Sequence, residues 1–485
     1  MPIPILLILF SIFNFLAPAP TTLKPYGAIP TERQLDWQET EVYGLVHFTP
    51  TTFENKEWGY GDADPALFNP LHFDARQIVN SAKEGGLKGL IVVAKHHDGF
   101  CLWPTATTPY NISKSPWRNG KGDMVKEFEQ ACRKAGLKFG IYCSPWDRNN
   151  PNYGKPEYLE IYRAQLKELY TQYGPLFMSW HDGANGGDGY YGGAREARKI
   201  DNTTYYDWTN TWTNITRVLQ PGANIFSDIG LDVRWVGNEK GFASDTSYAT
   251  FTPKPETGNL AVPGNVDTRS SGQGTRNGKY WIPAECDVPL RPGWFYHPEQ
   301  DGKEKSTDHL IDLYFKSVGR GACLDLGLAP TPEGILHTND VRILKEFGQQ
   351  IKETFKINLI LGATLRASHS RSDLESVKNL TDGNRYSYWA TPDDIHSASV
   401  EIQLDESKEI NLIQFRENIK MGQRVDNTKI EIIDSGKWKL LKSFTTIGAN
   451  RLIQLESPVK TDRLRITFKG PVALCISEIG LYNMK

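Results

Sequence analysis

The stretch Leu90-Ile-Val-Val-Ala-Lys-His-His-Asp-Gly-Phe100 decides the fold class of this chain. Its apolar residues run without interruption from 90 to 94 and are followed at once by charged and imidazole side chains. A short continuous apolar run is typical of a strand buried on both faces in a parallel sheet. Polar groups that directly follow such a strand lie at its C-terminal end, where α/β barrels build their active sites. The stretch therefore predicts a parallel α/β sheet with chemistry at one edge.

The same unit of strand, loop and helix recurs on both sides of this stretch. Strands are predicted at 42–48, 89–94, 139–144, 176–180, 224–228 and 322–328. Helices, with apolar residues three or four apart, are predicted at 75–84, 124–135, 156–173, 209–219 and 309–318. Alternation over about 300 residues predicts an α/β fold, a (β/α)8-like TIM barrel. A doubly wound sheet is the alternative, but no GxGxxG follows a first strand.

Two further regions depart from this pattern. The interval 243–279, rich in Gly, Ser, Thr, Asn and Pro, is predicted to be a long loop rising over the barrel mouth. After a helix at 339–355, short alternating runs at 399–404, 410–416, 428–433 and 463–468 predict antiparallel strands. We therefore expect a catalytic barrel over 21–356 and an all-β C-terminal sandwich over 357–485.

The N-terminal residues 1–20 are predicted to be a signal peptide. An apolar run at 4–16 is followed by Ala17-Pro-Ala-Pro20 and is too short to span a bilayer comfortably. We expect export to the periplasm or the extracellular space, with no membrane span in the mature protein. No Lys or Arg precedes the run, so a buried N-terminal helix is the alternative.

Composition narrows the class of partner. Lys and Arg number 55 against 57 Asp and Glu. This net charge of -2 does not indicate the basic surface that a nucleic-acid-binding protein needs. The six cysteines show no CxxC spacing, so neither a zinc site nor a disulfide framework is indicated. The 13 Trp and 21 Tyr are typical of a protein that binds sugar rings, or of one with a large aromatic core.

Ionisable and aromatic residues gather at the ends of four successive predicted strands. They are His47, His96 and His97, Tyr142, and Trp180 with Asp182. We expect no metal here, because HExxH-type spacing is absent and two adjacent histidines on a strand should point to opposite faces. A serine nucleophile would need a GxSxG elbow, which is also absent. Carboxylate chemistry remains, with Asp182 and the later Glu239 or Glu285 in the arrangement of a glycosidase.

At these residues the chain resembles the α-L-fucosidases of glycoside hydrolase family 29. The matching segments include Tyr43-Gly-Leu-Val-His-Phe48, Glu57-Trp58, Lys95-His-His-Asp-Gly-Phe100, Gly140-Ile-Tyr-Cys-Ser144 and Trp180-His-Asp-Gly183. The closing segment Cys323-Leu-Asp-Leu-Gly-Leu-Ala-Pro-Thr-Pro-Glu-Gly334 is also similar to the family, and the resemblance covers about 26–355.

The resemblance implies a retaining enzyme, with Asp182 as the nucleophile and a partner carboxyl about 5–5.5 Å away. The segment Arg234-Trp-Val-Gly-Asn-Glu239 resembles the part that carries the acid/base in the branch acting on α-1,3/4 linkages. Glu285 is the alternative acid/base, unless it is a structural carboxylate paired with Arg291. His181, beside the nucleophile, is expected to point away from the barrel centre.

Substrate-binding residues also follow from the resemblance. They are His47, Glu57, Trp58, His96, His97, Tyr142 and Trp180, and Trp58 could shelter the methyl group of fucose.

The C-terminal region resembles discoidin-like F5/8 type C domains in Leu380-Thr-Asp-Gly-Asn384, Tyr388-Trp-Ala390 and Ile476-Ser-Glu-Ile-Gly-Leu481. Such modules often bind sugars, sometimes with a structural calcium ion, although Trp389 is expected in the core.

The whole pattern predicts an exo-α-L-fucosidase that removes terminal fucose, mainly α-1,3/4-linked, from glycans and needs no catalytic cofactor. A related α-L-glycosidase of shifted specificity, such as an α-L-galactosidase, is one alternative. A non-catalytic fucose-binding protein is the other. The sequence leaves the oligomeric state open.

Overall fold

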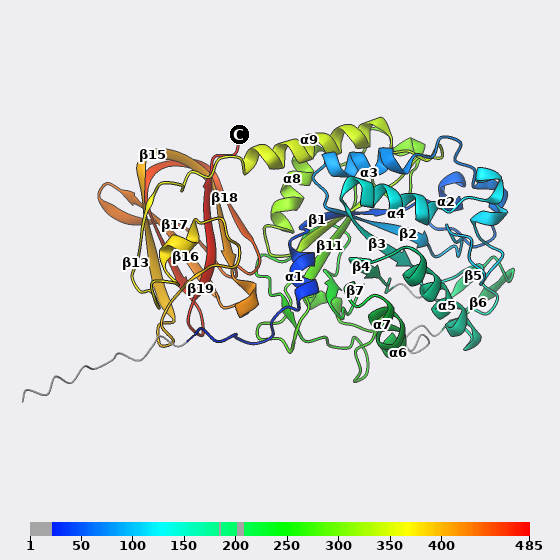
Figure 1. The fold of residues 1–485 in the computed structure, drawn as a ribbon, viewed down its shortest axis with the longest axis horizontal. Coiled ribbons are helices and arrows are strands. Elements are labelled where there is room, and N and C mark those ends of the chain that lie inside the picture. Colours follow the sequence, from blue (N-terminus) through cyan, green and yellow to red (C-terminus); the bar gives the residue numbers. More distant parts are fainter. Residues whose placement is uncertain (1–21, 184–185, 201–207) are drawn as a thin grey trace, which may run out of the picture.

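The computed structural model describes residues 22–183, 186–200 and 208–485. An α/β barrel and an all-β C-terminal domain lie side by side, and helix α9 (Thr338–Thr354) runs from one to the other (Figure 1). The predicted signal peptide, 1–20, lies outside the described residues. Within them, no helix is both long and apolar enough to cross a membrane.

Eight parallel strands close the barrel in the order β1-β12-β11-β8-β7-β4-β3-β2. Their bounds are β1 (Val42–Val46), β2 (Gly89–Lys95), β3 (Lys138–Cys143), β4 (Met178–Trp180), β7 (Asn224–Ser227), β8 (Val233–Trp235), β11 (Ala284–Pro289) and β12 (Cys323–Leu328). The barrel prediction is confirmed, but the sequence pattern missed β8 and β11. β8 is three residues long and contains Arg234, and β11 turns two carboxyl side chains inward, so neither has the apolar run of a buried strand.

The helices around the barrel match their predicted positions to within about two residues. They are α3 (Ala75–Glu84), α4 (Met124–Ala135), α5 (Glu157–Gln172), α8 (Thr307–Lys316), and α6 (Trp208–Thr211) with α7 (Arg217–Leu219). In α3, Ile78, Val79 and Ala82 are buried, and the Asp74 carboxylate accepts the Arg76 N–H and so caps the helix. α4 ends at Gly136, whose φ of 76° suits glycine.

Shorter elements complete the barrel domain. They are α1 (Glu32–Gln38), α2 (Pro50–Phe53), β5 (Gly189–Tyr191), β6 (Glu196–Arg198), β9 (Thr250–Phe251) and β10 (Tyr280–Trp281). β9 and β10 pair across the base of the predicted long loop 243–279, which otherwise holds one 3-10 turn at Thr268–Ser270.

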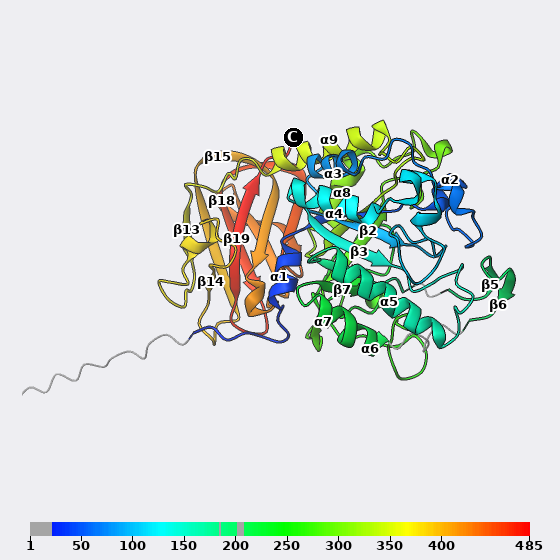
Figure 2. The same cartoon turned by 45° about the vertical axis from the view of Figure 1, so that its right-hand side comes forward.

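The C-terminal domain is an antiparallel sheet in the order β14-β19-β15-β18-β16-β17, with β13 added to β15 (Figure 2). The strands are β13 (Thr364–Ala367), β14 (Trp389–Ala390), β15 (Ser397–Glu417), β16 (Asn427–Asp434), β17 (Lys437–Phe444), β18 (Arg451–Lys469) and β19 (Cys475–Tyr482). The runs predicted separately at 399–404 and 410–416 both belong to β15, whose register against β18 shifts between Gln403 and Lys408. Trp389 is fully buried, which confirms it as a core residue.

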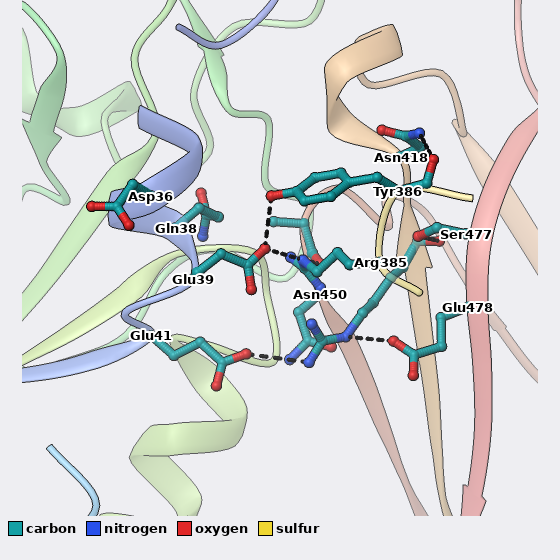
Figure 3. Close-up of polar contacts among 12 residues, drawn as sticks. Asp36, Gln38, Glu39, Glu41, Arg385, Tyr386, Asn418, Asn450, Ser477 and Glu478 are labelled. Carbon is teal, nitrogen blue, oxygen red and sulfur yellow. Dashed lines mark hydrogen bonds and ion pairs between the residues drawn. The ribbon is translucent and has the colours of Figure 1, made fainter. Parts of the chain in front are cut away.

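Ion pairs join the two domains beside α1 (Figure 3). The Glu39 carboxylate pairs with Arg385 at 2.5 Å and accepts the Tyr386 hydroxyl at 3.1 Å. Arg416 of β15 bridges Glu41 of the barrel and Glu478 of β19, both at 3.2 Å. Because one guanidinium holds a carboxylate from each domain, the contact fixes how the domains meet.

Candidate active site

A cavity of about 320 Å³ opens at the C-terminal ends of the barrel strands. This volume lies at the small end of the range for ligand pockets and fits a single sugar ring. Most of the predicted site residues line it together. They are His47, Trp58, His96, His97, Tyr142, Trp180, Asp182 and Glu239.

Asp182 follows β4 and lies on the cavity wall. The Tyr142 hydroxyl, from β3, donates to its Oδ2 at 2.7 Å, and His97 Nε2 lies 3.5 Å from the same oxygen. Burial, followed by the nearby His47 and Arg148, lowers the pKa of His97 well below its usual value. His97 is therefore neutral, so its ring places no positive charge beside Asp182.

The three histidines come together at the cavity. The His96 and His97 rings lie 4.1 Å apart, and His47 meets His96 edge to face at 5.4 Å. The expectation that His96 and His97 face opposite ways is wrong, because both follow the end of β2 at Lys95, where strand alternation stops. Burial lowers the pKa of His47 to about 3, so this ring offers neutral donor and acceptor nitrogens.

Glu285 lies in the barrel interior below the cavity and is 0% exposed. Its carboxylate accepts the indole N–H of Trp180 at 2.8 Å and the hydroxyl of Tyr43. Burial raises the pKa of Glu285 to about 7. It does not line the cavity, and its Trp180 partner stacks on Tyr142 with ring centres 4.9 Å apart.

The proposed structural pair between Glu285 and Arg291 is also wrong. Arg291 instead pairs with Asp301 at 2.9 Å and with Glu304 at 3.1 Å. Asp301, Glu304 and His337 are the group among the described residues whose ligand atoms lie close enough to share a metal ion. Since the Arg291 guanidinium already pairs with both of these carboxylates, the group is part of an ion-pair network.

Glu239 and Glu57 take different positions at the rim. Glu239 lines the cavity from the loop after β8, and the indole N–H of Trp294 donates to it at 3.3 Å. The Glu57 carboxylate is turned away, accepting the Trp294 backbone N–H at 2.5 Å and contacting His297 Nε2 at 2.9 Å. Glu57 therefore holds the loop that presents Trp294. Trp58 beside it is 48% exposed.

The cavity also includes polar and aromatic residues that the sequence reasoning missed. These are Asp228, Trp235, Thr268, Asp287 and Trp294. Burial raises the pKa of Asp228 to about 6 and that of Asp287 well above its usual value. Asp228 ended a predicted strand and could have been found by the same rule as Asp182. Asp287 belongs to β11, which the pattern did not reveal.

His181 points away from the cavity, as expected. Its Nε2 lies 2.9 Å from the Ser179 hydroxyl and its Nδ1 lies 3.2 Å from the Tyr162 hydroxyl. Burial lowers the pKa of His181 to about 3, so it adds no charge beside Asp182.

Comparisons with known proteins agree with this geometry. The family model for alpha-L-fucosidase matches residues 26–354, and the model for the F5/8 type C domain matches 364–478. Alpha-L-fucosidase 1 of Arabidopsis thaliana is 37% identical, over 97% of this chain and 90% of its own length. These matches cover both domains.

Solved structures give the same result. A glycoside hydrolase 29 family member from an unknown rumen bacterium is 39% identical, with a TM-score of 0.82 over 95% of this chain and 78% of its own. A Ruminococcus gnavus family 29 fucosidase in complex with fucose is 32% identical, with a TM-score of 0.84 over 97% of each chain. The chain therefore belongs to the α-L-fucosidase family, glycoside hydrolase family 29, and is a glycoside hydrolase with an F5/8 type C domain at its C-terminus.

Proposed function

We propose that this α-L-fucosidase works with retention, with Asp182 as nucleophile and Glu239 as acid/base. The observation that carries the proposal is the placement of these two carboxylates on one cavity that fits a single sugar. Asp182 is oriented by the Tyr142 hydroxyl at 2.7 Å, whereas Glu239 lies at the exposed rim, where a leaving group would depart.

In the first step an Asp182 oxygen forms a bond to the anomeric carbon while the glycosidic C–O bond breaks. Glu239 transfers its proton to the departing oxygen, which leaves as the alcohol of the remaining glycan. In the second step Glu239 takes a proton from water, whose oxygen displaces Asp182 and releases fucose. Two inversions at one carbon give net retention.

The neutral histidines and the tryptophans supply the fucose-binding surface in this proposal. His47, His96 and His97 face the cavity, and each neutral ring can donate to or accept from a sugar hydroxyl, depending on its tautomer. The exposed Trp58 offers an apolar face to the C6 methyl group. Glu57 acts indirectly, by holding Trp294, and Trp180 supports Tyr142 from below.

Glu239 is preferred over Glu285 because an acid/base must reach the glycosidic oxygen. Glu285 has both oxygens engaged, by Trp180 and Tyr43, beneath the cavity. Glu239→Ala should therefore lose about a hundredfold or more on glycans but far less on an aryl fucoside, whose leaving group needs no proton. Azide should rescue the variant and give a β-fucosyl azide. Equal losses on both substrates without an azide product would return the assignment to Glu285.

The preferred linkage is proposed to be α-1,3/4, since the Arg234–Glu239 segment resembles that branch. Fucose release from Lewis a and Lewis x trisaccharides, with little from 2'-fucosyllactose, is the expected result. The reverse order would overturn the linkage while keeping the chemistry. Release of α-L-galactose at a comparable rate would favour a shifted sugar specificity, and no turnover of any substrate would favour a sugar-binding protein.

We also propose that the protein is exported and that residues 1–20 are its signal peptide. The catalytic domain would then span 21–356 and the C-terminal domain 357–485. Mass spectrometry of protein from the periplasm or medium of a producing cell should give a mature N-terminus near residue 21. Intact Met1 in the cytoplasm would contradict it. A structural calcium ion in the C-terminal domain stays a prediction, tested by whether a chelator lowers the melting temperature.

A further inference from the structure

The long loop 243–279 is held from both sides, by the C-terminal domain and by the barrel strand that leads to Glu239. On the barrel side its Thr268 lines the cavity, and its Gly264 N–H donates to Asp228 at 2.7 Å. Gly237, two residues before Glu239, packs so closely on the loop that an added Cβ would lie 2.5 Å from the Thr268 carbonyl oxygen. The loop therefore forms the wall next to Glu239.

Gln423 of the C-terminal domain binds the start of this loop with both ends of its amide. Its Oε1 accepts the Ala249 N–H at 2.9 Å and its Nε2 donates to the Ser247 carbonyl at 3.0 Å. The side chain therefore pairs with the loop backbone much as a neighbouring strand would. Thr446 adds a bond to the Ser247 N–H at 3.0 Å.

The residue between these two contacts is held by the barrel. The carbonyl of Tyr248 accepts a bond from Arg234 at 3.0 Å, and Arg234 also donates to the Ser271 carbonyl at 2.8 Å. Arg234 is fully buried in β8 and lies five residues before Glu239. The peptide 247–249 is thus clamped between Gln423 in one domain and Arg234 in the other.

The far end of the loop is tied to the C-terminal domain as well, because Arg276 pairs with Asp426, with Nε and Oδ1 3.0 Å apart. At the near end, Arg451 donates to Asp245 Oδ1 at 2.8 Å. Both ends of the loop are therefore anchored on the C-terminal domain, whereas its middle meets the cavity. A loop anchored in this way is ordered before substrate arrives, which saves the cost of ordering it on binding.

From this arrangement we infer that Gln423 is a positioning residue for glycan recognition, and that the C-terminal domain builds part of the active-site wall. The inference rests on the proposed function, because it places the leaving glycan beside Glu239 and the loop. Its consequence is selective: substrates that contact this wall depend on Gln423, and a small aryl fucoside does not.

The test is Gln423→Met, which keeps the side-chain volume and removes both hydrogen bonds. We expect kcat/KM on the best glycan substrate to fall about three- to tenfold, because the wall beside Glu239 then has to be ordered when the glycan binds. The loss should come mainly from a higher KM. For the aryl fucoside, kcat/KM should change by less than about twofold. Hydrogen exchange should accelerate in peptides spanning 245–272.

Two matched controls separate positioning from general destabilisation. Gln403→Met changes an exposed glutamine whose side-chain amide donates to Leu404 and Asp462 within the C-terminal domain, and it should leave turnover of both substrates unchanged. Arg416→Met breaks the ion pairs with Glu41 and Glu478 at the same domain interface and should lower the melting temperature without altering the substrate ratio. Equal losses on both substrates with Gln423→Met, or unchanged exchange in 245–272, would overturn the inference. The exchange result holds even if the proposed mechanism or linkage fails.

Discussion

Carboxylates serve different purposes in the two domains. In the barrel the half-buried Asp182 lies at the cavity wall, where the Tyr142 hydroxyl donates to one of its oxygens. In the C-terminal domain the buried Glu417 carboxylate accepts hydrogen bonds from the backbone N–H groups of Arg424, Val425 and Gly448, at 2.6–2.9 Å. The first carboxylate faces a cavity, and the second fixes loops. Burial alone therefore does not mark a functional residue, whereas a position at a cavity does.

The largest effect is expected at Asp182. Asp182→Ala should lower kcat by about 10³- to 10⁵-fold, because the proposed covalent step would lose its nucleophile. The melting temperature should hardly change, and steady-state hydrolysis of an aryl fucoside measures the loss. Asp312→Asn, which alters an exposed carboxylate paired with Lys316, is the control and should be neutral. A loss below about tenfold at Asp182 would remove it from the nucleophile role.

A smaller effect is expected at the Tyr142 hydroxyl, which donates to Asp182. Tyr142→Phe should lower kcat/KM by about ten- to a hundredfold, the range for losing a hydrogen bond to a charged group. Tyr110→Phe removes a buried hydroxyl that has no hydrogen-bond partner among the described residues, and should leave activity unchanged. If the two variants behave alike, the Tyr142 contact with Asp182 does not matter for catalysis.

In the C-terminal domain the expected effect is on stability. Arg416→Met leaves Glu41 and Glu478 facing each other without their shared cation and should destabilise the domain contact by about 2 kcal/mol. Calorimetry should show a melting temperature lower by several degrees, with the aryl fucoside still hydrolysed normally at 25 °C. Arg463→Met, an exposed change on β18, is the control. An unchanged melting temperature for Arg416→Met would show that this ion pair does not hold the domains together.

The smallest effect concerns pH. Burial raises the pKa of Glu285 from 4.5 to about 7, so the folded protein keeps a proton that the unfolded chain releases. Wild-type stability from this group is therefore full below about pH 4.5 and is lost as the pH rises through about 7. Glu285→Gln removes this dependence and keeps an acceptor for Trp180. Its melting temperature should rise relative to wild type between pH 4.5 and 7, and a constant difference would mean that Glu285 is ionised in the fold.

Much of the fold and of the site could be predicted from the sequence, because polar and aromatic residues stand at the ends of apolar strand runs. His47 and Asp182 follow apolar runs and Tyr142 lies near the end of one, and parallel strands bring such ends to one edge. Asp287 and Trp294 could not be found in this way, since β11 has carboxyl residues where a buried strand usually has apolar ones.

The role of the loop 243–279 also lay beyond the sequence. Its composition indicated a loop over the mouth, but the contacts of Ser247 and Ala249 with Gln423 join residues about 175 positions apart. Only the packing of the two domains reveals that the loop is clamped.

The most direct test of the account is the configuration of the first sugar released. Proton NMR during early hydrolysis of an aryl α-L-fucoside should show the α-anomer of L-fucose first, with the β-anomer appearing later by mutarotation. That result is predicted if Asp182 forms a covalent intermediate and Glu239 serves both steps. Initial release of β-L-fucose would contradict the account, because it requires a single displacement by water.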